Sequence, residues 1–230
     1  MITKTIIIPC FNEFKTIELI LEKVKKNIST EDNIIIVDDG SNDGTKEYLE
    51  SISDKNIDVK FHDINQGKGK AIQTALSGNL NEIIIIQDAD LEYNPNDYKL
   101  LLKPFEETNA DVVYGSRFIG TNDYVRVHLF WHYLANKILT FICNIFTNLN
   151  MTDMETGYKS FKKDAIQSIK LNEKSFGIEP EITIKLAKKK FRFYEVPISY
   201  AGRSYDEGKK IGFKDAVRAI YCIFRYSFKS

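Results

Sequence analysis

The chain has 230 residues, of which 43% are hydrophobic and 28% are charged, and these values are ordinary for a folded globular protein and exclude an intrinsically disordered one. Its 32 basic and 32 acidic side chains balance to a net charge of zero, so no nucleic-acid partner is expected. The three cysteines lie far apart without metal-ligand spacing, which fits a reducing compartment and no disulfide framework.

Strands and helices alternate along the first half of the chain. Short apolar runs bounded by polar residues predict buried strands, because a covered parallel sheet needs strands that are apolar on both faces. We expect strands within residues 4–9, 33–38, 58–63, 82–87 and 111–118. Helical spacing of apolar residues follows at 13–28, at 45–51, after the glycine pair of residues 67 and 69, and from Pro95, which Asn94 caps. This alternation predicts a doubly wound α/β sheet.

Two aspartates follow the most apolar of these strands. Four consecutive isoleucines, residues 83–86, run into Asp88 and Asp90. These acids therefore lie at the carboxyl end of a buried strand, the edge of an open α/β sheet where ligands bind. Side chains two residues apart in an extended segment point the same way, so Asp88 and Asp90 can share one hard divalent cation. A role as helix cap is less favoured, because Asn94 already supplies that cap.

Polar and aromatic residues also follow the neighbouring strands. Asp38 and Asp39 end the second strand, and Phe11 and Glu13 follow the first. Because parallel strands end at one edge, an aromatic face, hydrogen-bond acceptors and a cation site should meet there, which predicts a site for a nucleoside diphosphate. Lys68 and the amides at the start of a helix form an expected anion site. The glycine patterns of a Walker loop and of a dinucleotide fold are absent, which argues against an ATPase and a dinucleotide oxidoreductase.

The second half of the chain differs in kind. Residues 126–148 predict a long apolar helix, and its narrow polar stripe indicates that most of its circumference is buried. Further strands are expected within residues 157–163 and 191–200, with a helix at 179–189 between them. The stripe consists of His128, His132, Asn136, Thr140 and Asn144.

The end of the chain predicts a cationic amphipathic helix. Lys214, Arg218 and Arg225 lie off an apolar face made by Phe213, Val217, Ile220, Tyr221, Phe224 and Phe228. From residue 185 to 229, twelve basic residues stand against four acidic ones, which suggests a surface that faces phosphates or lipid, or else a solvated basic face. We expect no signal peptide and no membrane-spanning helix, since the first residues lack a cationic and apolar leader and residues 127–149 are interrupted by polar side chains.

Seven motifs in order resemble those of family 2 glycosyltransferases with the GT-A fold, in particular dolichyl- and polyprenyl-phosphate sugar synthases. They are PCFNE, VDDGSNDGT, NQGKGKA, QDADLEY, YGSRF, DMETGYKSF and EVPISYAGRSYDEGKK, and they extend over essentially the whole chain. The resemblance implies an α/β, Rossmann-like, doubly wound mixed sheet in a GT-A domain of residues 1–210. Residues 211–230 would form an amphipathic, membrane-facing helix packed on or beside that domain.

The resemblance also implies roles for individual residues. Asp88 and Asp90 match the DxD motif that holds Mg²⁺ or Mn²⁺ against the diphosphate. Glu92, where many lipid-phosphate mannosyl synthases have Gln, adds negative charge and is an additional candidate ligand. Asp153 and Gly157 match the segment that closes the donor-sugar site. The nucleotide-binding set is Pro9, Phe11, Glu13, Asp39, Lys68 and Asp88; the acceptor-phosphate set is Arg117, Arg126, Arg203 and Lys209; and the catalytic set is Asp90, Asp153, Arg117 and Arg203.

The implied reaction moves a hexose from a nucleotide sugar of the GDP-mannose or UDP-glucose type to a polyprenyl or dolichyl phosphate. A phosphate acceptor is already anionic near neutral pH, so alignment and charge neutralisation matter more than a general base, and direct displacement inverts the anomeric centre. The three histidines need no catalytic role, and His62 is expected to be a surface strand residue. Such an enzyme would be peripheral on the cytoplasmic face of a membrane, by itself or through a separate membrane-anchoring partner.

Two alternatives stay open at this point. The first is a family 2 transferase that glycosylates a saccharide hydroxyl in surface polysaccharide synthesis, which would need a catalytic base such as Asp153 or Glu179. The second belongs to another class, a phospho-accepting signalling module, because such modules also place paired acids after a strand of a doubly wound sheet. The DxD spacing and the basic second half disfavour the signalling module.

Overall fold

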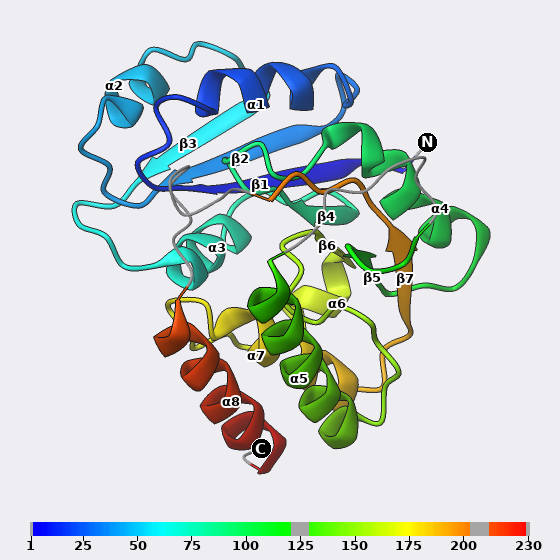
Figure 1. Cartoon of the computed structure of the whole chain (residues 1–230). Helices are drawn as coiled ribbons and strands as arrows, with labels where there is room; N and C mark the ends of the chain where they lie inside the picture. The colour runs from blue at the N-terminus through cyan, green and yellow to red at the C-terminus, as the bar shows by residue number, and fades with distance from the viewer. Residues whose placement is uncertain (1, 121–128, 203–211, 229–230) are drawn as a thin grey trace.

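A computed structural model of the chain describes residues 2–120, 129–202 and 212–228 (Figure 1). The first half contains β1 (Lys4–Cys10), α1 (Ile17–Lys25), β2 (Asn33–Asp38), α2 (Thr45–Glu50), β3 (Ile57–Phe61), α3 (Lys68–Leu76), β4 (Ile83–Ile86), the 3₁₀ turn η1 (Pro95–Asp97), α4 (Tyr98–Glu107) and β5 (Val112–Ser116). The second half contains α5 (Phe130–Thr147), β6 (Lys159–Lys162), α6 (Lys163–Gln167), α7 (Ile178–Lys188), β7 (Phe193–Pro197) and α8 (Phe213–Phe228).

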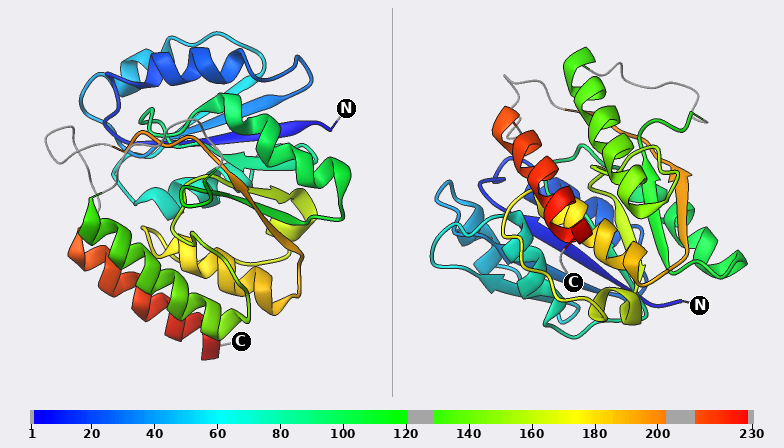
Figure 2. Two further views of the ribbon diagram at one scale, coloured as in Figure 1. Left: turned by 45° about the vertical axis from the view of Figure 1, so that its right-hand side comes forward. Right: turned by 90° about the horizontal axis from the view of Figure 1, so that it is seen from below.

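The seven strands form one mixed sheet with the order β3-β2-β1-β4-β6-β5-β7. Strand β6 runs antiparallel to β4 and β5, and the other pairs are parallel. Helices α1, α2 and α4 cover one face, and α3, α5, α6, α7 and α8 lie on the other (Figures 1 and 2). The doubly wound mixed sheet predicted from the sequence is therefore confirmed.

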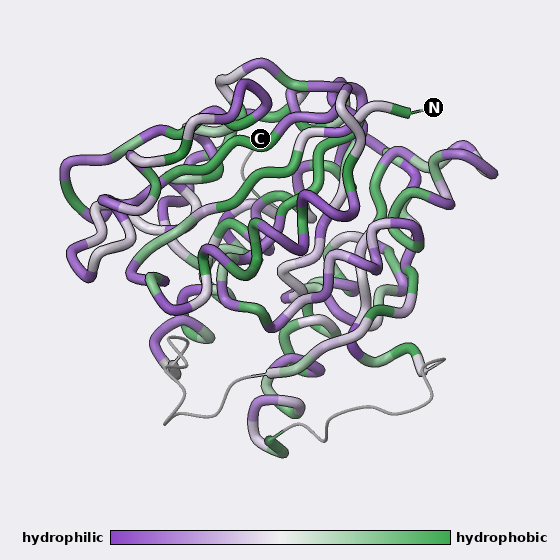
Figure 3. Tube along the Cα trace, turned by 90° about the horizontal axis from the view of Figure 1, so that it is seen from above, coloured by the Kyte–Doolittle hydropathy of each residue, from purple (hydrophilic) through white to green (hydrophobic). Residues whose placement is uncertain are grey.

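The isoleucine run that precedes the two aspartates is buried on both faces of this sheet. Ile83 and Ile85 belong to the core on the α1 and α4 side, and Ile84 and Ile86 to the core on the α3 and α7 side. Hydrophobic residues likewise run along the central strands in Figure 3. Since β4 has no solvent-facing side, its polar continuation can only emerge at the sheet edge.

The sequence predicts that the ends of β1, β2 and β4 share one edge of the sheet, and the structure confirms this. In the parallel register Cys10 pairs with Asp38, and Ile7 with Ile86. The loops that follow β1, β2 and β4 therefore leave the sheet on the same side, around the position where the strand order reverses at β1.

Several boundaries differ from the sequence-based expectation. The first helix is shorter than residues 13–28, because it begins at Ile17 after a turn in which the amides of Thr16 and Ile17 both donate to the Glu13 carbonyl. Asn94 caps a 3₁₀ turn rather than an α-helix, since its side chain accepts from the Asn96 amide before α4 begins at Tyr98. The short helix α6, which directly follows β6, has too few residues for a periodic pattern.

The polar stripe of helix α5 faces the protein interior. Asn136 and Thr140 are buried, and Asn144 exchanges hydrogen bonds of 2.8 and 3.1 Å with the backbone of Met151. The apolar residues Phe141 and Ile145 are instead 65% and 62% exposed. The polar stripe thus lies on the buried side of α5, where it satisfies polar groups of the 151–154 segment, and burial of the exposed apolar row against another surface stays a prediction.

Helix α8 packs beside α5, and both extend away from the sheet (Figure 2). Ala219, Cys222, Ile223 and Tyr226 face the core, while Phe146 of α5 contacts Phe224 and Phe228. Glu173, before α7, accepts hydrogen bonds from Arg218 (2.6 and 3.1 Å) and from the Tyr226 hydroxyl (2.7 Å). None of the described helices is both long and apolar enough to cross a membrane.

Candidate active site

A cavity of about 650 Å³ opens where the loops after β1, β2 and β4 meet. Its wall continues past the start of α3 and the loop after β5 to α5 and the first turn of α8. The structure thus brings together the described members of the predicted site except Asp38 and Asp153, which are buried outside the cavity lining. The predicted residues that line the cavity are Pro9, Phe11, Glu13, Asp39, Lys68, Asp88, Asp90, Glu92, Arg117 and Gly157.

Asp39 holds the loop that leads into α3. One carboxylate oxygen accepts from the Gln66 amide at 2.9 Å and the other from the Gly67 amide at 2.7 Å. The ring of His62 lies 2.6 Å from the same carboxylate and 2.9 Å from the Thr74 hydroxyl. The prediction that His62 is a surface residue was therefore wrong, since its side chain is only 8% exposed.

Glu13 is positioned from both ends. Its amide donates to the Thr45 hydroxyl at 3.0 Å, and its carboxylate accepts from the Thr16 hydroxyl at 2.9 Å. These contacts tie the loop after β1 to the start of α2, so the cavity wall formed by Pro9, Phe11 and Glu13 is fixed by its neighbours.

Lys68 is the first residue of α3, and its ammonium reaches across to the acidic edge. Its Nζ lies 2.8 Å from Asp88 Oδ1 and 3.3 Å from Glu179 Oε1. Burial alone would lower the pKa of Lys68, but the carboxylates of Asp88 and Glu179 outweigh it and raise that pKa. The residue predicted to bind an anion thus already forms ion pairs with two carboxylates.

Gly157 is explained by the position of Asp88. A Cβ atom at residue 157 would overlap Asp88 Oδ2 and the ring of Tyr93. The Gly157 amide donates to the Tyr93 hydroxyl at 2.7 Å, and Tyr93 stacks on Tyr158 with ring centroids 4.7 Å apart. The absent side chain therefore leaves room for the first aspartate of the DxD motif.

The donor set at this edge fits a hard divalent cation. Asp88 and Asp90 both line the cavity, and carboxylate oxygens are the ligands that Mg²⁺ and Mn²⁺ prefer. The ammonium of Lys68 pairs with the Asp88 carboxylate and there supplies the positive charge that a metal ion would bring. No cluster of three or more candidate metal ligands occurs among the described residues, so two carboxylates would leave most of the coordination shell to substrate phosphates and water.

Glu92 is engaged by its own neighbours. Its carboxylate accepts a 2.8 Å hydrogen bond from the Tyr200 hydroxyl, and its carbonyl accepts from the Ala201 amide at 2.9 Å. These bonds join the loop after β4 to the segment that follows β7. A metal-binding role for Glu92 stays a prediction.

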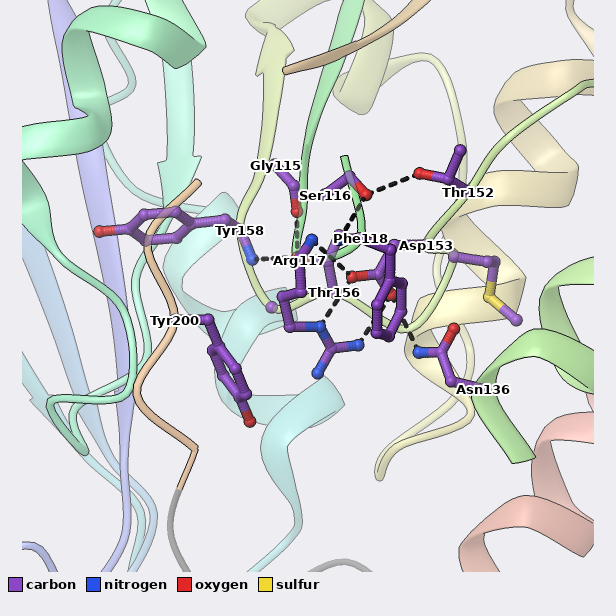
Figure 4. Close-up of polar contacts among 12 residues, drawn as sticks. Gly115, Ser116, Arg117, Phe118, Asn136, Thr152, Asp153, Thr156, Tyr158 and Tyr200 are labelled. Carbon is purple, nitrogen blue, oxygen red and sulfur yellow. Dashed lines mark hydrogen bonds and ion pairs between the residues drawn. The ribbon is translucent and has the colours of Figure 1, made fainter. Parts of the chain in front are cut away.

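Arg117, which lines the cavity, forms a bidentate ion pair with Asp153 behind it (Figure 4). Nε and Nη2 of Arg117 each lie 2.7 Å from an Asp153 oxygen, and Asn136 of α5 donates to the same carboxylate at 2.9 Å. Burial would raise the pKa of Asp153, but the Arg117 guanidinium and these hydrogen bonds lower it overall. Tyr200 lies beneath the guanidinium, 5.1 Å from its ring centroid to the guanidinium carbon. The sequence suggested separate roles for Arg117 and Asp153, whereas the structure makes them one unit.

Three members of the predicted acceptor-phosphate set, Arg126, Arg203 and Lys209, lie outside the described residues. Their assignment stays a prediction.

Two buried charged groups near the cavity were not identified as a site from the sequence. Lys159 of β6 is fully buried, and its ammonium lies 2.9 Å from Glu179 Oε2 and bonds to the Met154 and Thr156 carbonyls. Glu155 lines the cavity, and its Oε1 is enclosed without a hydrogen bond to any described residue. Burial and the nearby Glu179 raise the pKa of Glu155 to about 7. The only sequence signal was a charged residue at each end of a Gly-containing segment, Glu155 to Lys159.

Comparisons with known proteins identify the family. The model of Glycosyl transferase family 2 matches residues 5–170. The chain is 27% identical over 218 residues to undecaprenyl-phosphate mannosyltransferase of Micrococcus luteus, a match that covers 90% of this chain and 86% of the relative. It is 29% identical to UDP-N-acetylglucosamine–dolichyl-phosphate N-acetylglucosaminyltransferase of Methanococcus voltae, with 91% of each chain covered.

The fold is shared with a solved structure. Glucosyl-3-phosphoglycerate synthase from Mycobacterium tuberculosis, solved in complex with Mn²⁺, UDP and phosphoglyceric acid, superposes with a TM-score of 0.76 at 16% identity. The superposition covers 99% of this chain and 79% of that one, and it confirms the predicted GT-A fold. Because the family model matches residues 5–170, the chain is not a phospho-accepting signalling module. The acidic edge, its cavity and the match over residues 5–170 place this chain in glycosyltransferase family 2, as a glycosyltransferase.

Proposed function

We propose that this enzyme transfers a hexose from a nucleotide sugar of the GDP-mannose or UDP-glucose type to a polyprenyl or dolichyl phosphate. The observation that carries the proposal is the extent of the cavity, which runs from the acidic sheet edge to α5 and α8. A donor nucleotide at one end and a lipid phosphate at the other would meet inside it. The two relatives named for undecaprenyl- and dolichyl-phosphate transfer support this acceptor class.

The donor end uses the loops after β1, β2 and β4. Pro9, Phe11, Glu13 and Asp39 surround the nucleoside, and Asp88 and Asp90 hold Mg²⁺ or Mn²⁺. When bound, that cation neutralises the charge that develops on the departing diphosphate. Tyr93 and Gly157 fix the position of Asp88 through the contacts described above.

The acceptor end centres on Arg117. Asp153 takes its Nε and Nη2 groups, and within the described part of the chain its Nη1 donates no hydrogen bond, so one edge of the guanidinium remains to bind a phosphate oxygen. Because Asp153 and Tyr200 hold the guanidinium in place, little side-chain entropy is lost on binding. Arg126, Arg203 and Lys209 complete the acceptor-phosphate set in this proposal.

Attack by a phosphate oxygen needs no strong base, and the ion pair agrees with this. Asp153 is fully buried, and Arg117 and Asn136 occupy its oxygens, so it is a poor proton acceptor. The chain's residues would instead align the acceptor with the anomeric carbon and neutralise its charge, and direct displacement would invert the anomeric configuration.

Glu155 favours a second candidate acceptor, a saccharide hydroxyl. A carboxyl group with a pKa of about 7 beside the cavity has the property expected of a general base. A hydroxyl acceptor would require such a base, and a phosphate acceptor would not.

The variant Glu155→Gln separates these two functions. If the acceptor is a lipid phosphate, we expect a kcat loss well short of the about 10²-fold or more that removal of a general base causes. The wild type and the variant should then have pH profiles of kcat with the same shape through pH 7. Steady-state rates between pH 5.5 and 8.5 provide the measurement. A loss of about 10²-fold, together with disappearance of a pH transition near 7, would indicate a hydroxyl acceptor.

Two exposed apolar rows suit a lipid surface near the acceptor end. On α5 the row consists of Phe130, Ile138, Phe141 and Ile145, and on α8 of Val217, Tyr221, Phe224 and Phe228. Lys214, Arg218 and Arg225 accompany the second row, although Glu173 pairs with both arginines and reduces their net contribution. We propose that residues 1–210 form the catalytic domain, and that α5 and the 211–230 segment hold its cavity against the cytoplasmic face of a membrane.

Vesicle co-sedimentation tests this placement. The protein should bind anionic vesicles, since each basic residue near an anionic leaflet adds about 1 kcal/mol, and high salt should release it. The double variant Phe141→Ser/Ile145→Ser should weaken binding by about tenfold or more, because each buried apolar side chain contributes about 1.5–3 kcal/mol. Leu19→Ser is the control, since Leu19 is 50% exposed on α1, across the sheet. Equal binding to neutral vesicles would contradict the electrostatic part, and no binding to either would indicate a soluble acceptor or recruitment by a separate membrane-anchoring partner.

A further inference from the structure

The Lys68 side chain pairs with Asp88, one of the two carboxylates that the proposed function assigns to the metal. Its ammonium is 2.8 Å from Asp88 Oδ1, and its side chain is 15% exposed. A divalent cation that takes this oxygen would meet a fixed positive charge at contact distance. Like charges at that separation repel strongly in a partly desolvated site. The ammonium and the metal therefore compete for Asp88.

A second carboxylate lies ready to receive the displaced ammonium. Glu179 Oε1 is 3.3 Å from Lys68 Nζ, and the Glu179 side chain is only 6% exposed. Its other oxygen faces Lys159 at 2.9 Å, so Glu179 is held on the core side of the cavity. A short rotation of the Lys68 side chain would leave it paired with Glu179 alone.

The backbone around Lys68 cannot make this movement instead. Gly67 and Gly69 flank it, and a Cβ on either would overlap the backbone of the Glu173 to Ser175 segment. The Lys70 amide donates to the Lys174 carbonyl at 3.0 Å, and Asp39 accepts from the Gly67 amide. The start of α3 is clamped from two sides, so the change is confined to the Lys68 side chain.

We propose that Lys68 is an internal counter-cation that competes with the divalent ion for Asp88 and moves to Glu179 when metal and nucleotide bind together. Metal alone must move the ammonium from Asp88 to Glu179 while it adds positive charge to the cavity. Metal with a nucleoside diphosphate brings negative charge into the same cavity, which the ammonium then helps to neutralise. Lys68 thereby makes metal and donor nucleotide bind cooperatively, a coupling that acts equally on both ligands. This inference rests on the proposed function and adds a positioning role for Lys68 and Glu179.

Mn²⁺ binding to the whole chain tests the inference without any turnover. Free Mn²⁺ is measured by electron paramagnetic resonance, first without nucleotide and then with UDP or GDP. Lys68→Met should bind Mn²⁺ alone at least about tenfold more tightly than the wild type, because one positive charge has left the site. The gain in Mn²⁺ affinity on adding nucleotide should shrink by a similar factor. Glu179→Gln should bind Mn²⁺ alone more weakly than the wild type, because its lysine has only Asp88 as a charged partner.

Two further variants control for charge and folding. Lys70→Met removes a charge two residues along the same helix, where the lysine forms no ion pair within the described residues, and it should match the wild type. Lys68→Arg keeps the charge and should retain most of the cooperativity. Mn²⁺ affinity of Lys68→Met equal to or below that of the wild type would overturn the inference alone. A wild type that binds no Mn²⁺ even with UDP or GDP would overturn both the metal site and the inference.

Discussion

Asp90→Asn should remove metal-dependent nucleotide binding and reduce transfer by about 10²- to 10³-fold, while the protein stays folded. A shared carboxylate ligand supplies charge to the cation, and losing several kcal/mol of transition-state stabilisation has this effect, since about 1.4 kcal/mol is tenfold in rate. Asp90 Oδ1 accepts a 3.2 Å hydrogen bond from the Glu92 amide, and asparagine retains an oxygen for it. The turn after β4 should therefore survive the substitution.

This variant is more informative than a change at Asp88. Asp88 also pairs with Lys68 and packs on Gly157, so its removal would disturb several contacts at once. Asp63→Asn serves as the control, because Asp63 is exposed in the loop after β3 and its loss changes the net charge equally. Transfer rates and nucleotide affinity, each with and without Mn²⁺, give the result. Normal turnover by Asp90→Asn would refute the assignment of the DxD pair.

Arg117→Met should destabilise the fold by about 3–5 kcal/mol and abolish transfer. Asp153 is fully buried, and removal of its partner leaves an uncompensated charge in the protein interior. The double variant Arg117→Met/Asp153→Asn should recover much of the stability, because the orphaned charge is gone, but none of the activity. Denaturation in urea measures the free energy of unfolding, and acceptor-dependent rates measure the activity.

The chain contains a matched control for this ion pair. Arg192 holds Asp111 through the same two nitrogens at 2.7 and 2.8 Å, but the Arg192 side chain is 52% exposed. Arg192→Met should therefore cost no more than about 1 kcal/mol, as exposed pairs generally do. If Arg117→Met lowers the free energy of unfolding no more than Arg192→Met does, burial does not determine how much the Arg117–Asp153 pair contributes to stability. Full activity in the double variant would remove Arg117 from the acceptor site.

The acidic edge could be predicted from the sequence because it depends on local order. An apolar run such as residues 83–86 indicates a buried parallel strand, and parallel strands end at one edge, so the pattern predicts that Asp88 and Asp39 lie close together, as the observed register confirms. The resemblance to family 2 motifs added the expected roles. The strand pattern alone predicts that these acidic side chains share one edge of the sheet.

Contacts between distant segments could not be predicted in the same way. Arg117 and Asp153 are 36 residues apart and meet only because β5 and β6 pair and α5 supplies Asn136. The glycines at 67 and 69 are required by a loop about a hundred residues later, which no local pattern reports. In α5, hydropathy located the helix but not its buried side, because polar groups of the 151–154 segment took the stripe inward.

Formation of the lipid product tests the central proposal most directly. The purified full chain is incubated with Mn²⁺, vesicles that contain polyprenyl phosphate, and either GDP-mannose or UDP-glucose, and the lipid fraction is analysed by mass spectrometry for the product and by NMR for its anomeric configuration. The proposal predicts a polyprenyl-phosphate hexose with inverted anomeric configuration from one of these donors. The product should be absent without the divalent cation or when polyprenol replaces its phosphate. Transfer to a saccharide hydroxyl, or equal transfer to polyprenol, would contradict it.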